Sequence, residues 1–198
     1  MRVDAADLLA ALAKPFADSS DFDLNPALVS PAERILRPAA VLVGIWDQPS
    51  GARLILTKRA SHLSHHPGQI AFPGGKVDPG DTNAEAAALR EADEEIGLPH
   101  GHVTVLGRLP PHETVTGFSV VPVLGLVRAD FDPKPEHGEV DEVFSVPLSH
   151  VLAIANYRVE RRLWRGDWRR FYVVPYGPYY IWGATARILR GLAERLDP

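Results

Sequence analysis

The sequence lacks several features that would each point to a particular class of protein. None of its 198 residues is cysteine, which excludes a disulfide framework, a thiolate zinc site and a cysteine nucleophile, and which suits the reducing cytoplasm. It also lacks an excess of positive charge, since the formal net charge is −4. We therefore expect no general binding to nucleic acids or to anionic membranes, and we expect a polyanionic ligand to be met by a local basic pocket.

The N-terminus lacks the pattern of a signal peptide. Asp4 and Asp7 interrupt the apolar stretch, which is also too short to span a membrane. We expect an amphipathic helix there, followed from Ala17 to Arg37 by a long surface connection without periodicity. The length predicts one domain covering residues 1–198, with this helix and connection in residues 1–36 and the core in residues 37–198.

The most informative stretch runs from Phe72 to Leu98 and reads FPGGKVDPGDTNAEAAALREADEEIGL. It begins with a glycine-rich turn and continues into a strong helix pattern. Asp81, Thr82 or Asn83 is a suitable N-cap, and Gly97 followed by Pro99 ends the pattern. The spacing predicts a helix from about Thr82 to Ile96.

Three glutamates share one face of this expected helix. Glu91, Glu94 and Glu95 fall within an arc of about 100°. One interpretation is a solvated acidic face. The other is a metal site, because like charges at these spacings repel and clustered carboxylates suit Mg²⁺ or Mn²⁺, which also bind substrate phosphates. A Gly74-Gly75 turn, which lets the backbone approach a phosphate, favours the metal site.

The order of these residues resembles the Nudix box, the signature of hydrolases that cleave nucleoside diphosphates linked to another group. Gly75 is followed after five residues by Asp81 and later by the run READEEIGL from Arg90 to Leu98. The general box has glutamate where Asp81 stands and a gap one residue shorter before the arginine, so the resemblance assigns no role to Asp81.

The Nudix resemblance implies both a fold and a metal site. The implied fold is an α/β/α sandwich with a mixed β-sheet between helices, which the order of strands, helix and strands fits. The implied cofactor is Mg²⁺ or Mn²⁺. Its ligands would be Glu91, Glu94, Glu95 and a carbonyl of Gly75, and the catalytic residues would be Glu94, Arg90 and Glu139.

A second informative stretch, from Leu54 to Gly75, leads into this turn. It contains five basic or imidazole side chains in a short segment: Lys58, Arg59, His62, His65 and His66. They can be read as an exposed loop with solvated histidines or as a site for further phosphate groups of a substrate. A zinc site is disfavoured because no cysteine joins the histidines.

The same stretch resembles the motif of one Nudix subgroup, the coenzyme A pyrophosphatases. Ile55-Leu56-Thr57, Arg59-Ala60, Gly68 and Phe72-Pro73-Gly74-Gly75 are in register with that motif, and Ser64 stands where it has arginine or histidine. The implied substrate is coenzyme A or a derivative. The implied substrate-binding residues are Arg59, His65, His66, Gly68, Gly74 and Lys76.

The rest of the chain predicts further strands and a final helix. We expect strands at Ala39–Trp46, Arg53–Thr57, Val103–Leu109 and Phe118–Val127, a hairpin within Tyr157–Val174, and a helix that buries Ile188, Leu189, Leu192 and Leu196. The arginines of the hairpin fit a solvated surface or a homodimer contact better than nucleic-acid binding.

Polar residues outside the box supply further candidates for the site. In the acidic segment Pro133–Pro147, Glu139 and then Glu142 are the candidates for a general base, and His112 and Glu113 lie in a loop expected beside the substrate. Two alternatives to a coenzyme A pyrophosphatase stay open. They are a Nudix hydrolase of another substrate, such as ADP-ribose or NADH, and a non-catalytic nucleotide-binding module.

Overall fold

The structure, a computed structural model, describes residues 4–15, 17–28, 34–164 and 166–196. Its helices are α1 (Ala5–Ala13), α2 (Ala84–Ile96), α3 (Leu148–Val151) and α4 (Gly183–Leu196), with 3₁₀ turns η1 (His100–His102) and η2 (Ile154–Asn156). Its strands are β1 (Ser19–Ser20), β2 (Arg37–Trp46), β3 (Arg53–Arg59), β4 (Ile70–Ala71), β5 (Gly74–Lys76), β6 (Val103–Arg108), β7 (His112–Glu113), β8 (Phe118–Val127), β9 (Val140–Pro147), β10 (Arg158–Trp164) and β11 (Asp167–Val173).

A mixed sheet forms the centre of the molecule. In the described part of the chain it has nine strands, with the order β1-β7-β8-β2-β3-β4, and β5, β6 and β9 pair with β2, β8 and β3. Strands β2 and β8 run parallel along their full lengths, whereas β3 is antiparallel to β2 and to β9. The mixed directions bring β5, which precedes α2, against the first half of β2.

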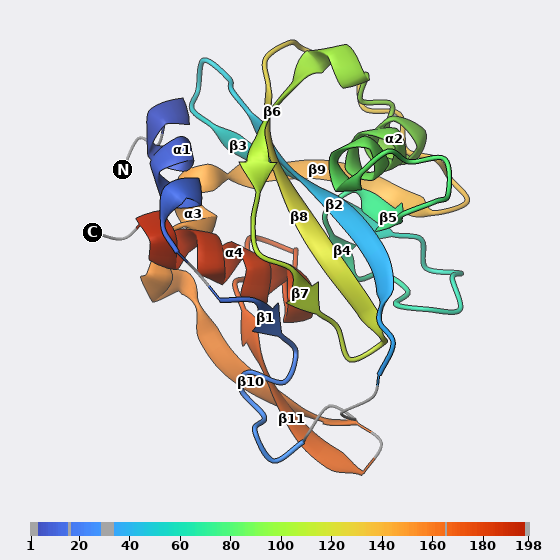
Figure 1. The fold of residues 1–198 in the computed structure, drawn as a ribbon, viewed down its shortest axis with the longest axis vertical. Helices are drawn as coiled ribbons and strands as arrows, with labels where there is room; N and C mark the ends of the chain where they lie inside the picture. Colours follow the sequence, from blue (N-terminus) through green and yellow to red (C-terminus); the bar gives the residue numbers. More distant parts are fainter. Residues whose placement is uncertain (1–3, 16, 29–33, 165, 197–198) are drawn as a thin grey trace.

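Each face of the sheet is covered by different helices, as Figure 1 shows. Because side chains alternate along a strand, β2 places Leu42 toward α2 and Val43 toward α4. Neighbouring β3 divides its side chains in the same way, with Ile55 on the α2 side and Leu56 on the other. The sheet between two helical layers confirms the expected α/β/α sandwich.

Most of the expected elements are present with small shifts at their ends. The N-terminal helix, the hairpin of β2 and β3, strands β6 and β8, the hairpin of β10 and β11, and α4 all form. The connection expected from Ala17 to Arg37 is wrong in one respect, because Ser19–Ser20 pairs in parallel with β7. Such a pair joins segments far apart in the sequence, and two residues carry no periodicity that could predict it.

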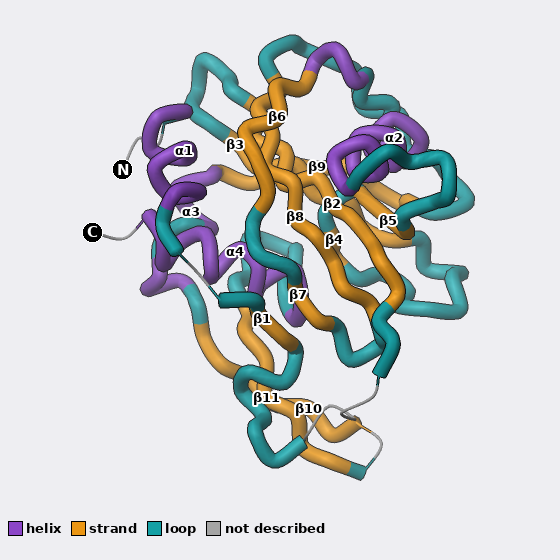
Figure 2. Tube along the Cα trace, viewed as in Figure 1, coloured by secondary structure: helices purple, strands orange, loops and turns teal. Residues whose placement is uncertain are grey.

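The β10–β11 hairpin extends away from the central sheet at the bottom of Figure 2. The segment after β1 runs beside it, since Asn25 accepts a hydrogen bond from the Arg170 amide and donates one to the Arg170 carbonyl. Arg165, expected in the hairpin turn, lies outside the described residues. Among the described residues, no helix combines the length and apolar character needed to cross a bilayer.

Candidate active site

Helix α2 begins and ends through local capping contacts. Of the three possible N-caps, Asn83 is the one that forms, and its side chain accepts a hydrogen bond from the amide of Ala86. Gly97 ends the helix in the left-handed conformation, with φ of 67°, and its amide returns to the carbonyls of the last turn. These caps place the glutamate-bearing side of α2 against β5.

Two glycines let β5 lie closely between β2 and α2, Gly74 on the side of β2 and Gly75 on the side of α2. Gly74 has φ of 150°, and a Cβ on it would clash with the backbone of Ala40 and Val41. A Cβ on Gly75 would lie 2.5 Å from Glu91 Oε1. The carboxylate of Glu91 is thus packed onto the backbone of Gly75 at a distance that only glycine permits.

Arg90 connects the acids around the helix into one network. Its Nε and Nη2 donate to the two carboxylate oxygens of Asp81 at 3.0 and 2.9 Å, a bidentate pair. Its Nη1 donates to Glu91 at 3.0 Å and to Glu94 at 2.9 Å. Nη2 also donates to the carbonyl of Lys76 at 3.1 Å. One guanidinium therefore ties the turn before the helix, the end of β5 and two of the expected ligands together.

These contacts give Asp81 a structural role that the sequence left open. The hydrogen bonds from Arg90 lower the pKa of Asp81 most, and the hydrogen bond from the Asp78 amide lowers it further. In turn, the hydrogen bonds to Asp81 raise the pKa of Arg90. Asp81 also bonds Asp78 twice and so closes the turn at residues 78–81. The carboxylate at this position anchors Arg90 rather than facing a ligand.

Glu95 is the most deeply buried acid of the cluster. Its side chain points between α2 and β5, the residue is 5% exposed, and it accepts a hydrogen bond from the Gly74 amide at 3.0 Å. Burial raises its pKa to about 7, aided by the charges of Glu91 and Glu139 and opposed by the Gly74 amide and Arg59. Burial likewise raises the pKa of Glu91, against the effect of Arg90. A solvated acidic face is therefore wrong for these two residues.

Glu94 and Glu139 lie further out. The side chain of Glu94 is 60% exposed and Arg90 holds it on the outer side of the helix. Glu139 is exposed at the start of β9, close enough to raise the pKa values of Glu91 and Glu95. In the residues described, no three acidic or histidine side chains already surround one point. Glu91 and Glu95 share the face toward β5, whereas Glu94 is turned toward Arg90.

The loop before β4 brings one expected substrate residue to this cluster. Arg59 lies at a bulge at the end of β3, its charge acts on Glu95, and its buried Nε has no hydrogen-bond partner among the described residues. The amide of Gly68, where φ is 68°, donates to the Arg59 carbonyl. His65 and His66 are exposed at the tip of the loop. Lys76 is also exposed, and its carbonyl is the acceptor for Arg90.

Three other candidates lie elsewhere or have other partners. His112 is fully buried in β7 and contacts Ser19 and Asp21, so the expectation that it faces the substrate is wrong. Its neighbour Glu113 belongs to the same short strand beside β1. Glu142 accepts a hydrogen bond from the Tyr179 hydroxyl on the opposite side of the sheet from α2.

Comparison with known proteins identifies the family. The model of the NUDIX domain matches residues 36–165, the part of the chain that contains β2, β5 and α2. The chain belongs to the Nudix family. The hydrolase relatives below make it a pyrophosphohydrolase, and Nudix hydrolases use divalent metal cations.

Curated Nudix relatives cover most of the chain. The uncharacterised Nudix hydrolase NudL of Escherichia coli strain K12 is 45% identical over 160 residues, 81% of this chain and 83% of that protein. The protein of the same name from Shigella boydii serotype 4 has the same identity and coverage. These relatives support the hydrolase and carry no substrate assignment.

Solved Nudix structures share the fold. The Nudix hydrolase RenU of M. smegmatis has a TM-score of 0.50 at 28% identity, over 58% of this chain and 73% of that one. The Nudix domain of Shewanella oneidensis NrtR, solved with ADP ribose, has a TM-score of 0.53 at 18% identity, over 87% of this chain and 96% of that one. At this identity the second likeness concerns the fold alone.

The residues present in the Nudix box fit a divalent cation. Glu91 and Glu95 are oxygen donors, the burial of each disfavours its charge, and they lie near a third acid, Glu139. A hard cation with oxygen ligands would offset this concentration of negative charge. The sequence missed two supports of this site. They are the anchoring of Arg90 by Asp81 and the hydrogen bond from the Ser61 amide to Asp141, which fastens the Arg59 loop to β9.

We predict that Glu95→Gln stabilises the metal-free protein at about pH 8, by roughly 1–3 kcal/mol. The folded-state pKa of Glu95 is about 7, against an ordinary value of 4.5. The folded state therefore binds the proton more tightly, and stability falls as the pH rises between these two values. Glutamine does not ionise, so it removes this loss of stability, and its side-chain oxygen can still accept a hydrogen bond from the Gly74 amide.

Urea unfolding of both proteins in EDTA from about pH 4 to pH 8 measures the difference, and added Mg²⁺ should then stabilise the wild type more than the variant. A constant difference across this pH range would contradict the burial of an ionisable Glu95.

We also predict that Gly75→Ala weakens Mg²⁺ binding by about tenfold or more, because the added Cβ displaces the Glu91 carboxylate. Gly80→Ala is the matched control, since a Cβ there meets nothing within 4 Å. Isothermal titration calorimetry with Mg²⁺ compares the three proteins. Equal affinities for wild type and Gly75→Ala would show that Glu91 takes no part in metal binding.

Proposed function

We propose that this pyrophosphohydrolase cleaves the pyrophosphate bond of coenzyme A or a derivative, yielding 3′,5′-ADP and 4′-phosphopantetheine, with Mg²⁺ or Mn²⁺ as cofactor. The observation that carries the proposal is the position of Arg59. This residue belongs to the subgroup motif, and its charge acts on Glu95 while its Nε is left without a partner among the described residues. It is a cation available to a substrate phosphate next to the metal-binding acids.

The acids of α2 have distinct tasks in this proposal. Glu91, Glu95 and the Gly75 carbonyl hold a cation between α2 and β5, and Glu94 completes the set on the solvent side. When bound, a divalent cation supplies positive charge to the pyrophosphate oxygens and lowers the pKa of water. Burial of Glu95 prepares the site for this charge, because its carboxylate gains a partner when the cation binds.

Arg90 is a positioning residue in the same site. It fixes the side chains of Glu91 and Glu94 from one guanidinium and is itself fixed by Asp81. Arg90 Nη1 holds Oε2 of the exposed Glu94 carboxylate, and its other oxygen, Oε1, is the ligand atom in this proposal. Replacement of Arg90 by lysine would lose the bidentate pair with Asp81 and leave the two glutamates without a common anchor.

Glu139 is the proposed general base. It is exposed, it lies on the same side of the sheet as Glu91 and Glu95, and its own carbonyl accepts the Ala60 amide at 2.8 Å. The base is therefore tied to the residue that follows Arg59. A carboxylate in this position can take the proton of the attacking water while Arg59 binds the phosphate.

The remaining substrate contacts follow the loop and β5. His65 and His66 present exposed imidazoles at the loop tip, Gly68 turns the chain back toward β4, and Lys76 is exposed at the end of β5. Gly74 belongs to the proposed substrate-binding set through its backbone, because the space that a Cβ would fill faces Ala40 and Val41 of β2. We assign the extra phosphate of coenzyme A to this basic rim, which the serine at position 64 interrupts.

In the same proposal residues 1–198 form one domain of a cytoplasmic enzyme, and the β10–β11 hairpin is a homodimer contact. The hairpin exposes Val159, Leu163 and Trp168. The pairing of Leu163 with Trp168 places two of these apolar groups side by side. The alternative substrate class is another nucleoside diphosphate derivative, such as ADP-ribose or NADH, which would use the same acids.

We predict that the protein with Mg²⁺ or Mn²⁺ hydrolyses coenzyme A faster than ADP-ribose or NADH, as resolved by chromatography of the products. Arg59→Ala should raise KM for coenzyme A by about tenfold or more, because the phosphate loses a cation. Glu95→Gln should abolish most turnover of every substrate. A cooperative thermal unfolding transition like that of the wild type would show that the variant is folded.

Preferential turnover of ADP-ribose would show that ADP-ribose rather than coenzyme A is the substrate, and it would not contradict the proposed metal site. No turnover of any substrate by the wild-type protein would favour a nucleotide-binding module. Near-normal activity of Glu95→Gln would remove the metal-binding role of α2.

A further inference from the structure

A hydrogen-bonded serine, histidine and aspartate lie on the face of the sheet opposite to α2, outside the site described above. Ser19 Oγ is 2.9 Å from His112 Nδ1, and His112 Nε2 is 3.2 Å from Asp21 Oδ1. The parallel register of β1 and β7 pairs Ser19 with His112 directly. Asp21 follows two residues later and therefore lies on the same side of the chain.

The hydrogen bonds define the protonation of the group. Asp21 is an acceptor, and its second oxygen, Oδ2, accepts the amide of Val115 at 2.8 Å. When His112 is neutral, Nε2 carries the proton that is donated to Asp21, and Nδ1 accepts a hydrogen bond from the hydroxyl of Ser19. His112 is fully buried, so water does not compete for either nitrogen. A neutral histidine that donates to a carboxylate through one nitrogen can take a proton from a serine hydroxyl through the other, here with Nδ1 rather than Nε2 facing the serine.

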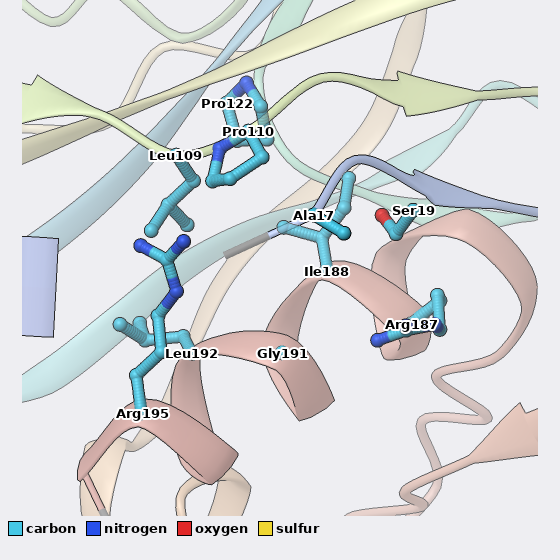
Figure 3. A pocket seen from close by; sticks show the side chains of 10 residues that line it. All are labelled: Ala17, Ser19, Leu109, Pro110, Pro122, Arg187, Ile188, Gly191, Leu192 and Arg195. Atoms are coloured by element: carbon cyan, nitrogen blue, oxygen red, sulfur yellow. The ribbon is translucent and has the colours of Figure 1, made fainter. Parts of the chain in front are cut away.

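The serine opens onto a pocket. Figure 3 shows the pocket between Leu109, Pro110 and Pro122 on one side and Ile188 and Leu192 of α4 on the other, with the Ser19 hydroxyl at its edge. Arg187 and Arg195 line the same pocket. Asp23 holds Arg187 Nε at 2.7 Å. The pocket thus combines a hydroxyl, apolar walls and two guanidinium groups.

A purely structural tether between β1 and β7 would not need this chemistry. A fully buried histidine beside a half-buried carboxylate costs desolvation free energy that an apolar pair of the same size would avoid. The tether would also have no reason to place its hydroxyl beside a pocket lined by cations. Both features are those of a nucleophile with its base and a site for the acyl group.

We propose that Ser19, His112 and Asp21 form a second, metal-independent hydrolytic site that acts on small carboxylic esters with a short apolar acyl group. Ser19 Oγ attacks the carbonyl carbon, and its proton passes to His112 Nδ1. The bond from carbon to the alcohol oxygen breaks as His112 returns the proton to the leaving alkoxide. Water then attacks the acyl-serine, gives a proton to His112, and the carboxylic acid leaves as Ser19 regains its hydrogen.

The pocket explains the choice of substrate and the expected rate. The proline and leucine side chains accept an apolar acyl chain. Arg187, whose Nε is held by Asp23, is the cation for negative charge that develops on the carbonyl oxygen, because Arg195 Nη1 already donates to the Ala11 carbonyl. The Ser19 amide is bonded to the Pro111 carbonyl and is not a donor for that oxygen. We therefore expect slow turnover, and covalent capture of Ser19 is the more sensitive measurement.

The first test treats the full-length protein in EDTA with a fluorophosphonate probe and locates the adduct by peptide mass spectrometry. The expected result is an adduct on Ser19 that is lost in Ser19→Ala. Hydrolysis of p-nitrophenyl butyrate should fall by about tenfold or more in Ser19→Ala and in Asp21→Asn. An unmodified Ser19, or hydrolysis unchanged in Ser19→Ala, would overturn the proposal and leave a structural tether.

A second test uses the absence of cysteine from the chain. Ser19→Cys introduces a single thiol, and His112 should make it react with iodoacetamide at least about tenfold faster than the exposed thiol of Ser50→Cys. Adding Asp21→Asn to Ser19→Cys should remove most of this acceleration, because the histidine loses its orientation. Equal rates for the thiols at positions 19 and 50 would contradict an activating His112.

Discussion

The contact of Arg90 with Asp81, Glu91 and Glu94 is the interaction on which the metal site depends. Three carboxylates within a single helical turn and its preceding loop would repel one another in the absence of a shared cation. The guanidinium offers five donors in a planar fork, and it uses them on three acids and the Lys76 carbonyl. The two-point contact with Asp81 fixes its orientation, so the positions of the glutamates follow from it.

The sheet makes this cluster compatible with a buried acid. Glu95 lies between α2 and β5, where Gly75 lets the helix sit close to the strand and the Gly74 amide donates a hydrogen bond to the Glu95 carboxylate. β5 is itself held by β2, whose side chains build the core on both faces. The same antiparallel and parallel pairings bring Arg59 and Glu139 to the edge of this layer. The acids of α2, the proposed phosphate-binding residue Arg59 and the proposed base Glu139 thus come from separate parts of the chain.

Local signals in the sequence predicted the elements that depend on local contacts. The capped alanine-rich helix, the strands of the two hairpins and the apolar face of α4 required only propensity and periodicity. The box motif also indicated Glu91, Glu94 and Glu95 as candidate residues of the site. The sequence could not distinguish the buried Glu95 from the exposed Glu94, because both follow from one helical spacing and only β5 separates them.

Contacts between distant segments account for what the sequence left open. The pairing of β1 with β7 places Ser19 beside His112. As a result His112 is a buried partner of Ser19 and not the substrate contact that the sequence had led us to expect. The role of Asp81 depended on the path of the Arg90 side chain. The spacing of neighbouring residues determines neither the pairing of β1 with β7 nor the path of the Arg90 side chain, because both depend on contacts between residues that are apart in the sequence.

The most direct measurement of the account is the anomalous diffraction of crystals of the protein soaked with Mn²⁺. The account predicts a manganese peak in the space between α2 and β5, with carboxylate oxygens of Glu91 and Glu95 at about 2.0–2.4 Å. A peak bound by other residues, or a site between α2 and β5 that stays free of manganese at saturating metal, would contradict the assignment of α2 as the metal-binding helix.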